Sequence, residues 1–153
     1  MTNETGSGQT SDFVTFEIGS QLFGVPIDEV QDVFKPQRLT PVPLSHPDVA
    51  GVLNLRGRIV TMIDCRQHLG LGRSSYSDMM AVGVERGNES YGLLIDKIGD
   101  VLSLESSDFE PNPVNLDPRW RAVSKGVFRL DRRLLIVINI ATILDFGMKR
   151  EAA

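Results

Sequence analysis

The chain has 153 residues, of which 41% are apolar, so it suits one ordinary domain or two very small ones packed tightly together. A formal net charge of −4 argues against a nucleic-acid-binding protein, whose surface is usually strongly basic. The single cysteine, Cys65, excludes an intrachain disulfide. No apolar run approaches the roughly 18 residues of a membrane-spanning helix, and the polar N-terminus predicts no signal peptide, so we expect a cytosolic protein.

The first third of the chain reads as short strands separated by turns and a loop. Residues 1–11 are polar and are expected to form a disordered tail. Apolar runs at residues 13–18 and 21–25 then predict two strands around a Gly-Ser turn. Four prolines lie between residues 35 and 48, and such density excludes a helix and predicts an extended crossing loop.

Residues 51–64 predict a tight hairpin. Two apolar, β-branched runs flank the sequence Arg56-Gly57-Arg58, and glycine supplies the positive φ that a tight turn requires. Without further information, the arginines of such a turn are interpreted as solvated surface residues. Asp64, at the end of the hairpin, is expected to cap a short helix.

The second half of the chain follows the same order. A stretch rich in glycine and serine, residues 71–77, predicts a linker. Further strands are predicted at residues 79–84, 90–95, 98–104, 126–130 and 134–138. A second proline-bearing loop covers residues 106–119, and Asn139 is expected to cap a closing helix.

An internal repeat explains this order. Residues 23–33 align with residues 91–101, with five identities among these eleven positions, and residues 51–55 align with 126–130. A repeated unit of about 70 residues, made mostly of short strands, is long enough for a small barrel of about five strands. Because each barrel alone would have a meagre core, we predict a mainly β (all-β) fold of two pseudo-repeated five-stranded β-barrels packed together. Short helices, including one near the C-terminus, complete it.

These features predict one domain over residues 12–148, between a disordered tail at 1–11 and a second tail at 149–153. Its sub-barrels are placed approximately at residues 12–72 and 78–148, and terminal elements are allowed to cross between them.

The repeat also separates structural positions from functional ones. Positions that are equal in both copies are expected to serve the fold, whereas positions that differ have more room for function. The hairpin tips differ, because Asp131 stands in the second copy where Arg56 stands in the first. This reversal of charge is a first argument that Arg56 has a function.

No catalytic constellation is apparent. His46 and His68 are the only histidines, and Cys65 could share a helix face with His68 at the i, i+3 spacing. Two ligands do not make a metal site, and no third group is apparent that would orient a Cys–His nucleophile pair. We therefore predict a binding module that is not an enzyme and has no metal or cofactor, with Cys65 in the core.

The hairpin carries a specific resemblance. Residues 51–60, Gly-Val-Leu-Asn-Leu-Arg-Gly-Arg-Ile-Val, resemble the CheW family of bacterial chemotaxis coupling proteins, and residues 13–33 and 91–104 resemble it too. The resemblance extends from about Asp12 to Phe146. It implies two packed five-stranded barrels and a free-standing adaptor, without catalytic activity, that couples transmembrane chemoreceptors to the histidine kinase CheA.

The resemblance also implies partners and surfaces. The cytoplasmic tip of the chemoreceptors would dock in an apolar groove between the barrels, and the regulatory domain of CheA would associate barrel to barrel. Carried over by match, Val30, Asp32, Arg56 and Gly57 would lie at the receptor-binding surface, while the kinase-binding residues stay unassigned. The resemblance is compatible with a ring-like assembly with kinase regulatory domains. It implies no nucleic acid, no direct membrane insertion, and a cytoplasmic protein that receptors recruit to the inner face of the membrane.

Two other classes of function compete with this interpretation. A small-molecule binder or enzyme could use the inter-barrel cleft, which would require titratable groups that converge there. A barrel that binds nucleic acid is disfavoured by the acidic charge, and salt-dependent retention on DNA or RNA would revive it.

Overall fold

The computed structural model describes residues 9–72 and 78–144. The predicted tail at 149–153, most of the predicted N-terminal tail and residues 73–77 of the predicted linker lie outside the described residues. The strands are β1 (Thr10–Ile18), β2 (Gln21–Pro26), β3 (Asp32–Phe34), β4 (Val49–Leu55), β5 (Arg58–Asp64), β6 (Met80–Arg86), β7 (Glu89–Ile95), β8 (Lys97–Glu105), β9 (Ser124–Arg129) and β10 (Leu134–Ile138).

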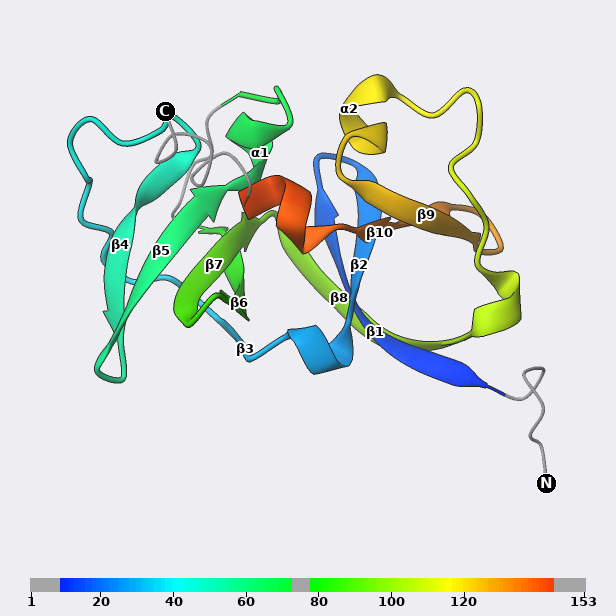
Figure 1. The fold of residues 1–153 in the computed structure, drawn as a ribbon, viewed down its shortest axis with the longest axis horizontal. Coiled ribbons are helices and arrows are strands. Elements are labelled where there is room, and N and C mark those ends of the chain that lie inside the picture. The colour runs from blue at the N-terminus through cyan, green and yellow to red at the C-terminus, as the bar shows by residue number, and fades with distance from the viewer. Residues whose placement is uncertain (1–8, 73–77, 145–153) are drawn as a thin grey trace.

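The strands form two five-stranded sheets with matching topology (Figure 1). The first sheet has the order β8-β1-β2-β10-β9, and the second sheet has the order β3-β6-β7-β5-β4. In each sheet the third and fourth strands run parallel, and the other neighbours run antiparallel. This matching order is the structural form of the sequence repeat, and it confirms the predicted mainly β fold with two five-stranded units.

Each sheet combines strands from both halves of the sequence. β1 and β2 pair with β8 and β10 in the first sheet, while β5 pairs with β7 in the second. Sheet membership therefore departs from the approximate division at residues 12–72 and 78–148. The link after β7 is a single residue, Asp96, which is too short to reverse the chain, so β8 continues into the first sheet. The link after β2 contains the 3-10 turn Ile27–Glu29 and leads the chain from the first sheet into β3 of the second. At the start of β1, Thr10 and Ser11 pair with β8, so this strand begins inside the predicted tail.

In each sheet, one backbone bridge ties the loop that follows one edge strand to the opposite edge strand. In the second sheet the loop after β3 returns to β4, where Thr40 and Val52 exchange hydrogen bonds of 2.8 and 2.9 Å. In the first sheet the loop after β8 returns to β9 through the corresponding pair, Glu110 and Val127, with two bonds of 2.8 Å. Equivalent contacts therefore tie the two sides of each sheet together in both copies, through the loop rather than through direct pairing of the edge strands.

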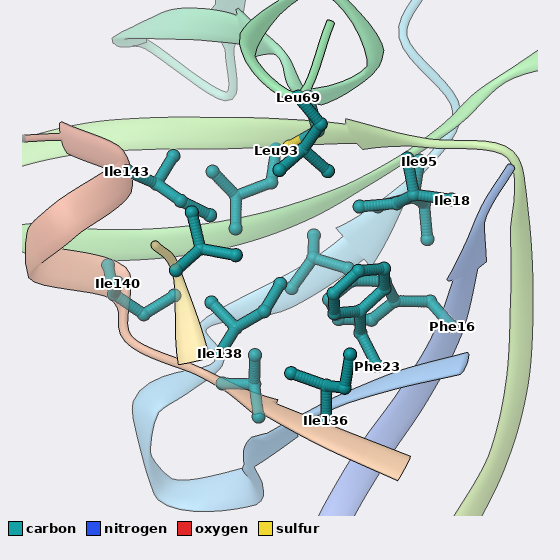
Figure 2. Close-up of a cluster of buried hydrophobic side chains, with 14 of the residues drawn as sticks. Phe16, Ile18, Phe23, Leu69, Leu93, Ile95, Ile136, Ile138, Ile140 and Ile143 are labelled. Atoms are coloured by element: carbon teal, nitrogen blue, oxygen red, sulfur yellow. The ribbon is translucent and has the colours of Figure 1, made fainter. Parts of the chain in front are cut away.

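The largest core cluster lies between the sheets rather than inside either one. Figure 2 shows side chains from β1, β2, β7, β10 and the closing helix converging there, including Phe16, Phe23, Leu93, Ile138 and Ile143. We call this the central cluster. Smaller clusters fill the inside of each sheet, around Met62 and Leu94 in the second and around Phe13 and Leu135 in the first.

Strand β10 shows why the central strands are apolar at every position. Leu135 and Val137 belong to the cluster inside the first sheet, while Ile136 and Ile138 point to the central cluster. Because successive side chains of a strand point to opposite faces, a strand buried on both faces needs an uninterrupted apolar run. The two sheets therefore share one core and form one packed unit.

The helices are short and close the ends of the sheets. They are α1 (Cys65–His68), α2 (Pro118–Arg121), the 3-10 turns η2 (Ile27–Glu29) and η4 (Ser106–Asp108), and a closing helix at residues 140–144. The predicted caps are confirmed: Asp64 accepts from the Gln67 amide, and Asn139 accepts from the Ala141 amide. In Figure 1 the closing helix lies at the junction of the two sheets. No helix within the described ranges is long and apolar enough to cross a bilayer.

Candidate functional site

The β4–β5 hairpin ends in a turn whose two central residues both have positive φ. Arg56 has a φ of 52° and Gly57 a φ of 86°, as the type I′ turn of tight hairpins requires. The side-chain oxygen of Asn54 accepts a hydrogen bond from the Gly57 amide at 2.9 Å. Asp131, at the equivalent tip of the first sheet, does not have positive φ, so the two tips differ in backbone as well as in charge.

An ion pair fixes the side chain of Arg56. Its Nη2 lies 2.6 Å from Oδ2 of Asp32, at the start of β3. In the order of the second sheet, β5 lies three strands away from β3. In a flat sheet this separation would be roughly 14 Å. The ion pair between Arg56 and Asp32 therefore requires that the sheet curls. The Arg56 side chain is 68% exposed and that of Asp32 is 22% exposed. The guanidinium is thus held on one side and open to a partner on the other.

A second set of polar contacts surrounds Gln31, the residue before Asp32. Arg58 donates to the Gln31 side chain at 3.2 Å and to the Ser90 hydroxyl at 3.4 Å, and Gln31 donates to Glu85 at 3.0 Å. Sequence reasoning missed Gln31, Ser90 and Glu85, because nothing in their local pattern shows that the sheet curls to bring them together. Arg58 was visible as the second arginine of the turn.

Among the four predicted receptor-facing residues, the structure joins Asp32 and Arg56 directly. Gly57 lies beside them, exposed, with no atom within 4 Å of where its Cβ would be. Val30 differs, because it is half-buried and packs against the central cluster. Its side chain therefore contributes to the core as well as to the surface.

A cavity of about 600 Å³ opens between the sheets, next to these contacts. The link between β2 and β3, the end of β6, the start of β9 and the closing helix all line it. Its charged lining residues are Asp28, Glu29, Glu85, Arg86 and Lys125. Half of the lining residues of this inter-sheet cleft are charged, and the cleft is thus mainly polar, in contrast to the apolar groove that the family resemblance implies.

The residues considered for nucleophilic chemistry lie away from that cavity. Cys65 is fully buried in the central cluster, which confirms its prediction as a core residue. Burial, reinforced by the charges of Asp64, Asp48 and Asp96, raises the pKa of the Cys65 thiol far above its ordinary value. At neutral pH the thiol is therefore protonated and a poor nucleophile.

Both histidines contact one buried carboxylate. Nδ1 of His68 lies 2.7 Å from Oδ2 of Asp48, and Nδ1 of His46 lies 3.6 Å from the same oxygen. This contact ties the first proline-bearing loop to α1. Over the described ranges, no three His, Cys, Asp or Glu side chains are arranged to hold a metal ion.

Comparison with known proteins places this geometry in a family. The CheW-like domain model matches residues 12–147. "Chemotaxis protein CheW" of Klebsiella aerogenes is 30% identical, over 91% of this chain and 86% of that protein, and the protein of the same name from Thermotoga maritima is 28% identical, over 86% of each. The crystal structure of scaffolding protein TtCheW from Thermoanaerobacter tengcongensis superposes with a TM-score of 0.75 at 28% identity, over 85% of this chain and 89% of that one. The chain therefore belongs to the CheW-like domain family.

Proposed function

We propose that this chain is a non-enzymatic adaptor that couples transmembrane chemoreceptors to the histidine kinase CheA in a bacterial chemosensory array. Family membership supports the role, since relatives are named chemotaxis and scaffolding proteins. The observation that carries the proposal is the guanidinium of Arg56, which Asp32 holds while most of the side chain stays exposed. A fixed, exposed cation suits recognition of a partner.

The receptor-facing surface in this proposal consists of Val30, Asp32, Arg56 and Gly57. Arg56 supplies a charged donor for oxygen atoms at the receptor tip, and Gly57 leaves the turn without a side chain that would obstruct the approach. Val30 supplies the apolar part of the surface from its half-buried position. The charged cleft between the sheets adjoins this surface, so the docked tip would present polar or basic side chains to it.

The kinase would bind elsewhere, through apolar residues that the repeat presents twice. Val33 and Val101 occupy equivalent positions in the two copies and are 38% and 54% exposed. Leu44 and Val114, in the two proline-bearing loops, are 98% and 95% exposed. Exposed apolar residues at matching places in both copies suit a partner that is itself a repeated double barrel, as the regulatory domain of CheA is by family resemblance. Alternating contacts of this kind would also build a ring-like assembly.

On this proposal the protein is cytoplasmic and reaches the inner face of the membrane only through receptors. It has no nucleic-acid partner, inserts into no bilayer and catalyses no reaction. An enzyme that used the inter-sheet cleft would need a nucleophile or a tunable base there, and neither the thiol of Cys65 nor the imidazole of His46 or His68 lines the described cavity.

The deciding experiment reverses the charge of Arg56. Arg56→Glu places an acid beside Asp32 and opposite the receptor oxygen atoms, and should weaken binding by about 2–5 kcal/mol if the contact is buried in the complex. Binding is measured by co-sedimentation with membranes that contain a full-length chemoreceptor of the bacterium that encodes this chain, with and without its CheA. Kinase binding should persist.

Arg132→Glu is the matched control, because Arg132 lies at the equivalent hairpin tip of the first sheet and is exposed. It should bind receptor membranes like the parent protein. Parental receptor binding by folded Arg56→Glu, or equal losses by both variants, would overturn the proposed receptor surface.

A further inference from the structure

The carboxylate of Asp32 lies in a hollow that a glycine creates. β3 and β6 pair at the edge of the second sheet, with Asp32 directly opposite Gly83. A Cβ atom on Gly83 would collide with Oδ1 of Asp32. This oxygen is shielded from solvent and accepts no hydrogen bond from any residue that the structure describes. One oxygen of Asp32 is thus seated against the β6 backbone while the other holds Arg56.

The equivalent position of the first sheet is built differently. Gly24 in the first sheet and Gly92 in the second are equivalent in the repeat. Gly24 pairs with Thr15, whereas Gly92 pairs with Gly83. Thr15 is therefore the equivalent of Gly83 in the first sheet. The Thr15 side chain fills the space, and its hydroxyl donates to the backbone oxygen of Asp100 at 2.5 Å. The shared topology therefore does not require glycine at this position.

The sheet that has glycine at this position is also the sheet that carries Arg56 at its hairpin tip. In the first sheet, Asp100 is the repeat equivalent of Asp32, but it is exposed, and the equivalent hairpin tip carries Asp131 in place of Arg56. Only in the second sheet do a glycine hollow, a seated carboxylate and an arginine tip occur together among these equivalent positions.

We propose that Gly83 is a positioning residue for the receptor-facing arginine. Its missing side chain lets Asp32 lie flat against β6, and from there Oδ2 fixes the guanidinium of Arg56 in one pose before the receptor arrives. Asp32 acts through Arg56, whose other donors stay available for a carboxylate or carbonyl oxygen of the receptor tip. Fixing a long side chain in advance lowers the entropy that binding must remove. This inference rests on the proposed receptor surface.

Gly83→Ala tests the inference with a single methyl group. The next atoms that the methyl would meet are the Asp32 backbone oxygen at 3.4 Å and Cε1 of Phe34 at 3.5 Å, so the fold needs to move little besides the carboxylate. We expect a melting temperature close to that of the parent and unchanged kinase binding. Affinity for the receptor membranes should fall about tenfold, the loss of roughly one charge-assisted hydrogen bond.

A double-variant comparison separates positioning from a general structural effect. In an Arg56→Ala background, Gly83→Ala should weaken receptor binding no further, because the side chain that it positions is absent. Gly99→Ala is the matched control: its Cβ would meet the Thr15 hydroxyl at 2.6 Å, also a side-chain oxygen on a paired strand, but in the first sheet. It should leave receptor binding unchanged.

The outcomes distinguish this inference from the proposed function. If Arg56→Ala binds receptor like the parent, the receptor surface itself is wrong. If Arg56→Ala loses binding but Gly83→Ala keeps it, or if Gly83→Ala weakens both backgrounds equally, only the positioning role is overturned. Should Gly83→Ala unfold, Asp32→Asn replaces it in the test, since it keeps the shape of the side chain but removes its charge. Asp32→Asn should weaken receptor binding when Arg56 is present and should have no further effect in the Arg56→Ala background.

Discussion

Arg56 is not the residue that would make this turn most stable, although its side chain suits the recognition of a partner. A non-glycine residue in the left-handed region costs roughly 1 kcal/mol per residue, and its exposed ion pair with Asp32 contributes at most about as much. Neither effect makes arginine the best residue for stability at this turn. The first sheet avoids the strain with a different turn at Asp131, so the strained arginine tip is not a requirement of the shared topology.

The packing of Val30 changes the effect that we expect from the substitution Val30→Asp. As a receptor-facing residue, Val30 predicts that Val30→Asp weakens receptor binding more than kinase binding. Because Val30 also packs against the central cluster, the new charge would be partly buried. We expect it to lower the free energy of unfolding by about 1–3 kcal/mol. Thermal unfolding measures this, with Val33→Asp, an exposed position on β3, as the control that should cost about 1 kcal/mol or less. Equal stability of Val30→Asp and the parent would show that Val30 faces solvent.

At the scale of elements, the bridge between the loop after one edge strand and the opposite edge strand depends on a glycine in each sheet. Gly51 and Gly126 have the same φ of 152° at equivalent positions of β4 and β9. A Cβ on Gly51 would lie 2.7 Å from the carbonyl oxygen of Thr40, and one on Gly126 would lie 2.7 Å from that of Glu110. In both cases the Cβ would crowd the backbone oxygen that forms the bridge, and at Gly126 it would also collide with the ring of Phe109.

Gly51→Ala and Gly126→Ala should therefore open the bridges and destabilise the protein, each by about 2–4 kcal/mol, because strain and lost backbone hydrogen bonds add. Chemical denaturation measures the loss, and amide exchange at Val52 or Val127 should accelerate in the corresponding variant. Gly24→Ala is the comparison, since its Cβ would meet only the flexible end of Leu135. If the alanine variants retain slow exchange at the bridge, the edges are held by other contacts.

These elements also show what the sequence can predict. The positions of most strands, both caps and the repeat follow from local patterns, because alternation, glycine and capping residues act over a few residues. The short edge strand β3 was not predicted. The assignment of strands to sheets does not follow, since the repeat looks the same whether β3 stays beside β1 or crosses to β6. Arg56 was visible through its motif, whereas the roles of Gly83 and Gln31 depend on the curl of the second sheet, which no local pattern records.

At the scale of the whole molecule, the exchange of strands makes the two halves of the sequence dependent on each other. Residues 1–72 contain β1 and β2 of the first sheet and β3, β4 and β5 of the second, so neither sheet is complete in that half. The central cluster draws on both halves, with Phe16 and Phe23 from one and Ile136 and Ile138 from the other (Figure 2). A fragment of either half would expose this apolar surface and lack partners for its edge strands.

We therefore expect that neither residues 1–72 nor residues 78–153 fold alone, and that mixing the two fragments restores the native structure. The pairings of β1 with β8 and of β5 with β7 would hold the fragments together without a covalent link at residues 73–77. Far-ultraviolet circular dichroism and sedimentation would show two unfolded chains that become one cooperatively melting 1:1 complex. Ile138→Ala in the C-terminal fragment is the control, because a cavity in the central cluster should weaken reassociation by about 2–5 kcal/mol. A cooperative melting transition in either fragment alone would show instead that the half-chains are independent folding units.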